Sequence, residues 1–326
     1  MNENHNQPYK NLPYFALALD PIHVGTGGYR LGRVDMTIVR EPGTNLPKIP
    51  GTSLAGACRT YATIQENGKF PHCAGQGQSG KGHCGQPACP ICVTFGFSKG
   101  EGGSFQGLAQ FSDARLVFFP VHSLAGPVWV TCPMALRDSG VHESEPADGQ
   151  VRVADGVKQS RRLNLGWLML EVTGNGLSLN AGKFPGVPQE ILHRAVLVSD
   201  KMFGHIVNDN LEVRTSVSID PQTGAAAEHA LYTYEALPRA SVLSFEVVVS
   251  DPKYYRIAVQ VEENGKKETK FRIPLSDQSK PQGDIQKVKG TVANGLKLFE
   301  SLGVGAMGTR GMGRLRVLGL NPGGGQ

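Results

Sequence analysis

The chain has 326 residues, of which 40% are hydrophobic, so it can bury the core of one elaborated domain or two and is not a disordered chain. Its 33 Lys and Arg against 28 Asp and Glu give a formal net charge of +5, which permits an anionic partner without requiring one. Glycine is the outlier. Its 42 residues are nearly twice the usual share of roughly 7%, and they indicate tight turns and close approach of the backbone to a ligand.

The N-terminal segment Met1–Pro13 is polar and has no apolar run, so it does not resemble a signal peptide. No stretch of the sequence approaches the roughly 18 apolar residues of a membrane-spanning helix. We therefore expect a cytoplasmic protein with no membrane partner. In that reducing compartment, the six cysteines are not expected to form disulfides.

The first half of the chain predicts a strand, a loop and a helix. Phe15, Leu17 and Leu19 alternate with alanines, which is typical of a strand with one buried face. A glycine-rich loop over 20–33 and an extended segment over 34–39 follow. Thr52 or Ser53 is placed to cap a helix, whose apolar face would hold Leu54, Ala57, Cys58 and Tyr61. Further along, the sequence predicts a strand over 108–119 and a short helix over 190–198.

The second half predicts mainly strands, at 213–219, 231–236, 242–249 and 255–261. A helix over 284–302 follows, because apolar residues recur there at spacings of three and four, and Gly303 stands in a good stop position. A final strand is predicted over 314–320. A strand–loop–helix start and a helix–loop–strand finish suit an α+β sandwich of ferredoxin-like (RRM-like) type with insertions in its middle.

Cysteines and histidines are concentrated in residues 68–106, where core-forming residues are few. Cys73, Cys84, Cys89 and Cys92 provide four soft ligands, the last two as Cys-Pro-Ile-Cys, and this pattern favours a structural tetrahedral zinc site over a loop with free thiols. His72 and His83 are possible substitutes for one cysteine, so the exact ligand set stays open. Cys58 and Cys132 lie in apolar settings and are expected in the core.

Two glycine-rich stretches imitate nucleotide-binding motifs. Gly303–Gly313 contains a dinucleotide-like glycine pattern, but it follows a predicted helix and precedes a strand, which is the wrong context. Gly75–Lys81 is close to a P-loop but continues with Gly82 where a Ser or Thr should hold magnesium. We reject both nucleotide readings, and we interpret the C-terminal glycines around Arg310 as backbone held close to phosphates.

Asp35 ends a flexible loop that also carries His23, Arg30 and Arg33. Such a loop can grip a phosphate chain and place a carboxylate beside it as a cation ligand or base, although a turn aspartate is the commoner role. On the predicted strand Tyr232–Glu235, the two tyrosines should share one face, where they either stack on bases or pack in the core.

Taken in order, several segments resemble the RAMP superfamily, and within it the Cmr-type backbone subunit, subunit four, of type III CRISPR effector complexes. The segments that carry the resemblance are Pro21–Gly28, Val34–Asp35, Ile38–Glu41, Ile49–Gly56, Phe111–Leu116, Pro120–Gly126, Trp129–Pro133, Leu231–Pro238 and the glycine loop after the last predicted helix. The resemblance extends over nearly the whole chain, 1–326, as a single domain. The long cysteine segment keeps the related Csm-type subunit open as an alternative.

The resemblance implies a ferredoxin-like palm with a β-hairpin thumb, here over 205–240, and a zinc-binding insertion over 68–106. Copies of such a chain would form a helical filament along a guide RNA, together with other CRISPR effector subunits, and would cut complementary target RNA at regular intervals. The target's own 2′-hydroxyl would be the nucleophile, with a divalent Mg or Mn ion stabilising charge. A purely structural, guide-RNA-binding subunit is the other reading.

Site residues also follow from the resemblance. The catalytic residue of the family maps onto Asp35, with His23 and Glu235 as candidate helpers. The expected RNA contacts are Arg30, Arg33, Lys48, Ser53, Arg59, Gly305, Gly308, Arg310, Gly311 and Gly313.

Overall fold

The chain folds into two units, each assembled from three separate stretches of sequence. The computed structural model describes residues 7–27, 34–75, 82–99, 103–157, 161–174, 176–225, 231–263 and 266–320. Unit 1 comprises Met1–Pro13, Gly51–Asp113 and Glu246–Phe299, and unit 2 comprises Tyr14–Pro50, Ala114–Phe245 and Glu300–Gln326. No helix within the described ranges combines the length and apolarity needed to cross a bilayer.

A large mixed sheet dominates unit 2, so the fold is α+β. β6 pairs antiparallel with β7, whereas β7–β11 and β8–β10 are parallel pairs. The strand order is β17 (Leu315–Leu318), β1 (Tyr9–Ala18), β14 (Val242–Ser250), β6 (Ala114–Val121), β7 (Val128–Thr131), β11 (Ala195–Leu197), β8 (Gln150–Val153), β10 (Leu168–Val172) and β9 (Arg162–Leu165), with β2 (Lys48–Ile49) on β6.

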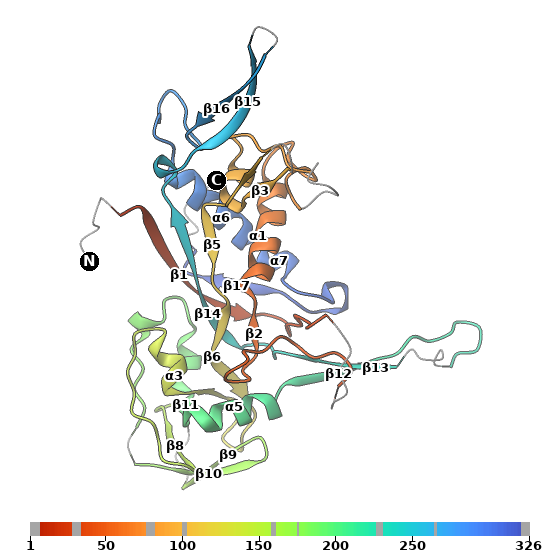
Figure 1. Cartoon of the computed structure of the whole chain (residues 1–326). Coiled ribbons are helices and arrows are strands. Elements are labelled where there is room, and N and C mark those ends of the chain that lie inside the picture. The colour runs from red at the N-terminus through yellow and green to blue at the C-terminus, as the bar shows by residue number, and fades with distance from the viewer. Residues whose placement is uncertain are drawn as a thin grey trace. The chain divides into compact units, whose positions relative to one another are not determined.

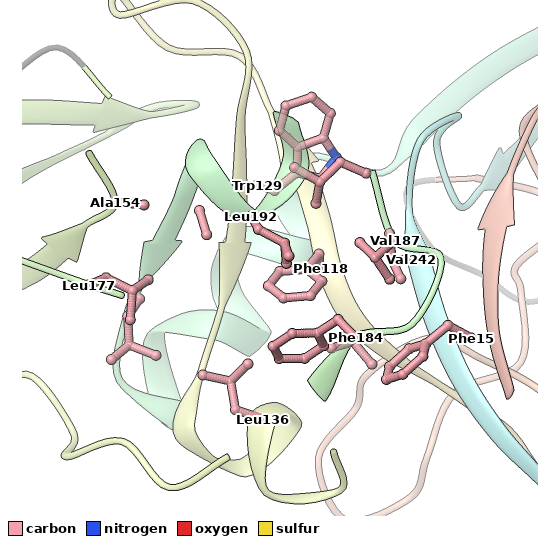
Figure 2. Close-up of a cluster of buried hydrophobic side chains, with 14 of the residues drawn as sticks. Phe15, Phe118, Trp129, Leu136, Ala154, Leu177, Phe184, Val187, Leu192 and Val242 are labelled. Carbon is pink, nitrogen blue, oxygen red and sulfur yellow. The ribbon is translucent and has the colours of Figure 1, made fainter. Parts of the chain in front are cut away.

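Aromatic rings and aliphatic side chains together form a buried cluster in unit 2 (Figure 2). The Phe184 ring lies 5.3 Å from that of Phe118 and 5.7 Å from that of Phe15, with tilted or edge-on geometry. Such pairs add to the free energy gained by burying their large apolar area. The Trp129 indole N–H donates to the carbonyl of Ala240 at 2.9 Å, so the one polar atom of that buried ring is paired. Unit 2 also contains the helices α3 (Pro133–Arg137), α4 (Gln189–His193) and α5 (Asp200–Asp209).

A hairpin of β12 (Glu212–Ser216) and β13 (Tyr232–Ala236) follows α5 within unit 2. Figure 1 shows it extending away from the rest of that unit. The extended segment 34–40 lies against the base of the hairpin. Met36 forms a parallel bridge with Tyr234, and Ile38 forms an antiparallel bridge with Gly25. The base of the hairpin therefore belongs to a small three-stranded arrangement made of segments distant in sequence.

Unit 1 is built around two helices that approach closely, α1 (Gly51–Gln65) and α6 (Ile285–Lys297). Gly295 makes the approach possible, because a Cβ there would lie 2.3 Å from the backbone oxygen of Cys58. α2 (Pro90–Phe95) packs on both helices, so the cysteine segment belongs to this packing. Unit 1 also contains β3 (Phe97–Ser98), β4 (Ser104–Phe105), β5 (Ala109–Phe111), the hairpin β15 (Ile257–Glu263) and β16 (Lys266–Arg272), and the start of α7 (Phe299–Leu302).

Several predicted elements need correction. Neither Thr52 nor Ser53 caps α1, because the helix begins at Gly51, whose N–H donates to Asp113 at 2.8 Å. The strand expected over 108–119 is two strands, β5 and β6. The helix expected over 190–198 ends at His193 and is followed by a buried strand, and the helix expected over 284–302 is interrupted at Leu298. The predicted helix stop at Gly303 is confirmed, with a positive φ of 76°.

Candidate functional site

The base of the hairpin has one polar and one apolar face, because side chains alternate along β13. Tyr234 and Ala236 pack with Met312, and Met36, Tyr232 and Met307 pack against this cluster. The side chains of Thr233 and Glu235 lie on the opposite face, where both bind the segment that carries Asp35. The glycine-rich C-terminal loop thus covers the apolar face and leaves the polar face to the candidate site.

Asp35 is exposed, yet its carboxylate is held in a fixed orientation. Its Oδ2 accepts the backbone N–H of Thr233 at 2.7 Å and the Thr233 hydroxyl at 2.8 Å. These two bonds, the backbone one first, lower the pKa of Asp35 below its ordinary value, so the carboxyl group stays ionised. An exposed, oriented carboxylate of lowered pKa is a weak base and a good ligand for a cation or a hydroxyl group.

Glu235 is engaged in a bidentate ion pair with Arg40. The Nη1 and Nη2 atoms of Arg40 donate to the two carboxylate oxygens at 2.6 and 2.9 Å, and only 7% of the Glu235 side chain is exposed. Glu235 also accepts the N–H of Ile38 at 2.8 Å, and Arg40 Nε donates to Asn208 at 3.0 Å. Through these contacts, Glu235 attaches the segment that carries Asp35 to β13.

His23 is buried beside the apolar face. Its Nδ1 lies 2.6 Å from the carbonyl of Glu235, and because a carbonyl only accepts, Nδ1 is the donor. The ring contacts Tyr234 edge-on at 5.9 Å, and its Nε2 has no hydrogen-bond partner among the residues that the structure describes. His23 is thus placed to fix the backbone of β13, on the side of the strand where Tyr234 lies.

The C-terminal glycine loop packs against the extended segment 21–23. The N–H of Ala306 donates to His23, and that of Gly313 donates to Pro21, each at 2.9 Å. Gly305 has a φ of 92°, and a Cβ there would lie 2.5 Å from the oxygen of His23. Gly308 has open space around it, and Gly311 has a positive φ of 75°. Close packing on His23 thus explains Gly305, whereas Gly313 has a positive φ of 99° and a Cβ there would lie 2.9 Å from the oxygen of Val304.

Arg310 lies where the glycine loop meets the hairpin. Its guanidinium is 5.6 Å from the centre of the Tyr232 ring, and Nη1 donates to Ser216 at 3.4 Å. Arg310 is exposed, so it retains surface for an anionic partner. Of the other predicted RNA contacts, Lys48 lies on β2 and Ser53 is half-buried in the first turn of α1, whereas Arg30 and Arg33 lie outside the described residues.

Four cysteines of unit 1 form the one cluster of potential metal ligands found among the described residues. The Sγ atoms of Cys73, Cys84, Cys89 and Cys92 all lie within 4.8 Å of one another. Cys89 precedes α2, and its sulfur accepts the N–H of Cys92 at 3.5 Å. Hydrogen bonds from Cys92 lower the pKa of Cys89 to about 5, which favours the thiolate form that binds metals.

Arg59 and His83 surround this cluster without joining it. The guanidinium of Arg59 donates to the carbonyls of Cys73 at 2.7 Å and Gly96 at 2.8 Å, and its Nη2 contacts His83 Nδ1 at 2.9 Å. Arg59 is thus engaged with the cysteine segment, so these contacts do not support the interpretation that it binds guide RNA. His72 is exposed, and the structure brings together the four cysteines rather than either histidine.

Sequence reasoning missed Arg40, Thr233 and Asn208, which orient the candidate site. Only Arg40 had a local signal, as a basic residue near Asp35. Thr233 and Asn208 are 198 and 168 residues away from their partners Asp35 and Arg40, so neither contact could be read from spacing.

Comparisons with known proteins show relatives of similar sequence and similar fold. The CRISPR system Cmr endoribonuclease Cmr4 of Pyrococcus furiosus is 24% identical over 259 residues, which are 72% of this chain and 80% of that protein. The type III-B Cmr-beta structure in the apo state has a chain of similar fold, with a TM-score of 0.59, 16% identity and coverage of 94% of this chain and 96% of that one.

Two further solved structures share the fold. The Cmr-beta structure bound to cognate target RNA gives a TM-score of 0.59 at 15% identity, covering 96% of this chain and 98% of that one. Oligomeric Cmr4 from Pyrococcus furiosus gives 0.56 at 18% identity, covering 95% and 98%. A family model described as the RAMP superfamily matches residues 16–316, which is nearly the whole chain. The chain therefore belongs to the RAMP superfamily.

Proposed function

We propose that this chain is a backbone subunit of a type III, Cmr-type CRISPR effector complex that binds guide RNA and cleaves complementary target RNA. The curated relative is named an endoribonuclease, and one of the similar structures is bound to cognate target RNA. The observation that carries the proposal is Asp35, an exposed carboxylate fixed by Thr233 at the base of a projecting hairpin. Its partners would be guide RNA, target RNA, further copies of the chain and other effector subunits.

Within this proposal, the sheet of unit 2 contributes to the ferredoxin-like palm and residues 205–240 form the thumb. Arg310 and Lys48 would contact RNA phosphates, and the exposed guanidinium beside Tyr232 supports this role for Arg310. Arg30 and Arg33 remain sequence-based expectations for the same task. Contacts to phosphates confer affinity without reading sequence, which suits a subunit that must accept any guide.

In the proposed cleavage step, the 2′-oxygen of the target attacks the adjacent phosphorus while the bond to the 5′-oxygen breaks. The proton of the 2′-hydroxyl leaves to solvent, and the departing 5′-oxygen takes up a proton, which leaves a 2′,3′-cyclic phosphate and a 5′-hydroxyl. Because its pKa is lowered, Asp35 would orient the 2′-hydroxyl rather than act as a strong base. His23 and Glu235 would hold Asp35's surroundings in place, through the carbonyl of Glu235 and the Arg40 pair.

Asp35 also suits a divalent cation, because it is an exposed carboxylate whose orientation is fixed by the bond from Thr233 to Oδ2. Mg or Mn is commonly held by one or two carboxylates, with water and substrate phosphates completing the shell. Such an ion, when bound, would offset the charge that develops on the phosphate.

We further propose that the cysteine cluster binds a structural zinc ion. In a regular tetrahedron with Zn–S bonds of about 2.3 Å, neighbouring sulfurs are about 3.8 Å apart. The Sγ atoms of Cys84 and Cys92 are 3.8 Å apart, and those of Cys92 and Cys73 are 3.6 Å apart. Because α2 packs on α1 and α6, zinc bound by residues 68–106 would stabilise unit 1 as a whole.

The decisive test of the ribonuclease role uses a labelled complementary target and a reconstituted complex. Asp35→Ala and Asp35→Asn should lower cutting by about 100-fold or more while leaving guide and target binding intact. Asp148→Asn, which changes another exposed aspartate of unit 2, is the matched control and should cut normally. If both Asp35 variants cut at the wild-type rate, the two hydrogen bonds to Thr233 serve the fold alone, and the chain is a guide-binding scaffold.

A further inference from the structure

An open pocket of about 710 Å³ lies beside the candidate site, within unit 2. This volume is in the range of roughly 300–1,000 Å³ that holds small ligands. The lining of the pocket includes Thr26, Thr37, Arg40, Glu41, Asn45 and Glu235.

The pocket lies on the same face as the Asp35 carboxylate. Thr37 follows Asp35 by two residues in an extended segment, and Glu235 follows Thr233 by two residues on β13, so each pair shares a face. Two residues of extended chain span about 7 Å. RNA whose backbone passes Asp35 therefore has a nucleoside within reach of the pocket.

The charges of the pocket favour a base over a phosphate. Arg40 carries one positive charge, but both oxygens of Glu235 are bound to it, and the second carboxylate of the lining, Glu41, is paired with Arg115 at 3.2 Å. The described lining therefore offers no unpaired positive charge to a phosphate, which would lose hydration without gaining an ion pair. A neutral group with hydrogen-bond donors and acceptors has a smaller cost of desolvation.

The side-chain amide of Asn45 can form hydrogen bonds with such a ligand. It is exposed, and its side-chain amide forms no hydrogen bond with any residue in the described part of the chain. The residue is held in place by its backbone, with a φ of 57° and an N–H that donates to Glu41 at 2.9 Å. An asparagine amide has both donors and an acceptor, and it can pair with the edge of a nucleobase.

We infer that this pocket binds a nucleobase of the RNA that passes Asp35, with the Asn45 amide pairing to the edge of the base. The inference rests on the proposed function, because it takes the RNA at Asp35 as given. It adds a subsite that holds the nucleotide beside the scissile linkage, so that base binding helps to position the 2′-hydroxyl.

The test removes one base and keeps the sugar. Two complementary targets are prepared. Each carries an abasic ribonucleotide, which retains its 2′-hydroxyl, at one of the two nucleotides that flank a chosen cut. With wild-type complex, the abasic target should be cut about tenfold more slowly at that site than the normal target, from the loss of about one good hydrogen-bonded contact. Asn45→Gly should cut the normal target equally slowly and show no further effect of the abasic residue.

Asn45→Gly suits the backbone, since glycine adopts a positive φ without strain. Gly43→Ala is the control in the same turn, because a Cβ there meets nothing within 4 Å, and it should retain the wild-type difference between the two targets. Equal cutting of both targets by wild-type complex, or an undiminished abasic effect in Asn45→Gly, would overturn the inference.

A second readout does not depend on cutting. A target with 2-aminopurine at the same nucleotide should fluoresce more brightly on binding, because the base leaves the stack of its neighbours, and this increase should be lost in Asn45→Gly. If wild-type complex cuts nothing but retains the Asn45-dependent increase, the ribonuclease proposal fails and the pocket stands. An increase unchanged by Asn45→Gly would exclude the pocket.

Discussion

Thr233 donates both its backbone N–H and its hydroxyl to one carboxylate oxygen of Asp35, across 198 residues of sequence. The hydroxyl also accepts the N–H of Asp35 at 3.1 Å, so the two residues form a closed set of hydrogen bonds. The hairpin thus controls the orientation and the charge of the carboxylate on which the proposed chemistry depends.

Thr233→Val should raise the pKa of Asp35 towards its usual value of about 3.9 and slow cutting by about tenfold, because the hydroxyl bond is lost while the backbone bond remains. The lowered pKa favours the folded state above the ordinary Asp pKa, and this contribution is lost as pH falls through the lowered value. In Thr233→Val this contribution should be smaller, and its loss should be complete at a higher pH than in wild type. Carboxylate NMR titration measures the shift, and Thr233→Ser, which keeps a hydroxyl, should behave as wild type.

Glu235→Gln should destabilise the chain by about 3 kcal/mol, because it leaves the mostly buried Arg40 without its carboxylate partner. The control in the same hairpin is Glu212→Gln. Glu212 pairs with Arg214 in a more exposed setting, so its loss should cost at most about 1 kcal/mol. Chemical denaturation gives both values, and hydrogen exchange over 232–236 should report the local loosening. Equal losses of stability in the two variants would mean that the Arg40–Glu235 pair does not hold the Asp35 segment against β13.

Gly295→Ala should destabilise unit 1 by about 1–3 kcal/mol or more, since the new methyl group would meet the backbone of Cys58. Gly290→Ala, on the same helix α6, has nothing within 4 Å and should stabilise the chain by about 0.5–1 kcal/mol. Thermal unfolding of the two variants should therefore shift in opposite directions. A shift in the same direction would show that α1 can retreat from α6 at little cost.

Zinc content should be about one ion per chain in protein purified without added metal, and Cys92→Ser should reduce it to near zero. Cys132→Ser, at a buried cysteine outside the cluster, should retain the metal. Burial raises the pKa of the Cys58 and Cys132 thiols, so they should stay neutral and unreactive towards thiol reagents. Chelation should then expose four reactive thiols, and six would mean that removing the metal unfolds the core around Cys58 and Cys132.

Regular patterns in the sequence predicted the elements whose partners lie nearby or whose periodicity is strong. The apolar spacing of α6 and the alternation in β1, β13 and β14 were sufficient, as was the cysteine spacing for the cluster of potential metal ligands. The helix α5 was missed although its signals are present: Ser199 accepts the N–H of Met202 as a cap, and Phe203, Ile206 and Val207 form its buried face. A continuous apolar run over 195–198 was read as the end of a helix because such a run has no period of its own.

The sequence identified only part of the candidate site. Asp35 was identified through resemblance, but its partners depend on which strand lies next to segment 34–40, and that is decided by packing over long range. Arg59 shows the same limit. A basic residue on α1 was expected to bind RNA, and its contacts with the cysteine segment could not be foreseen, because they depend on that segment folding back onto the helix.

The two-faced base of the hairpin also constrains how this chain can vary in length. A slip of one residue along β13 would turn Tyr234 towards the polar face and direct Thr233 and Glu235 into the methionine cluster. Insertions or deletions between β12 and β13 change the reach of the hairpin while the pairing at its base stays in register. Relatives of this chain can therefore lengthen or shorten the tip freely, whereas the five residues of β13 must keep their count.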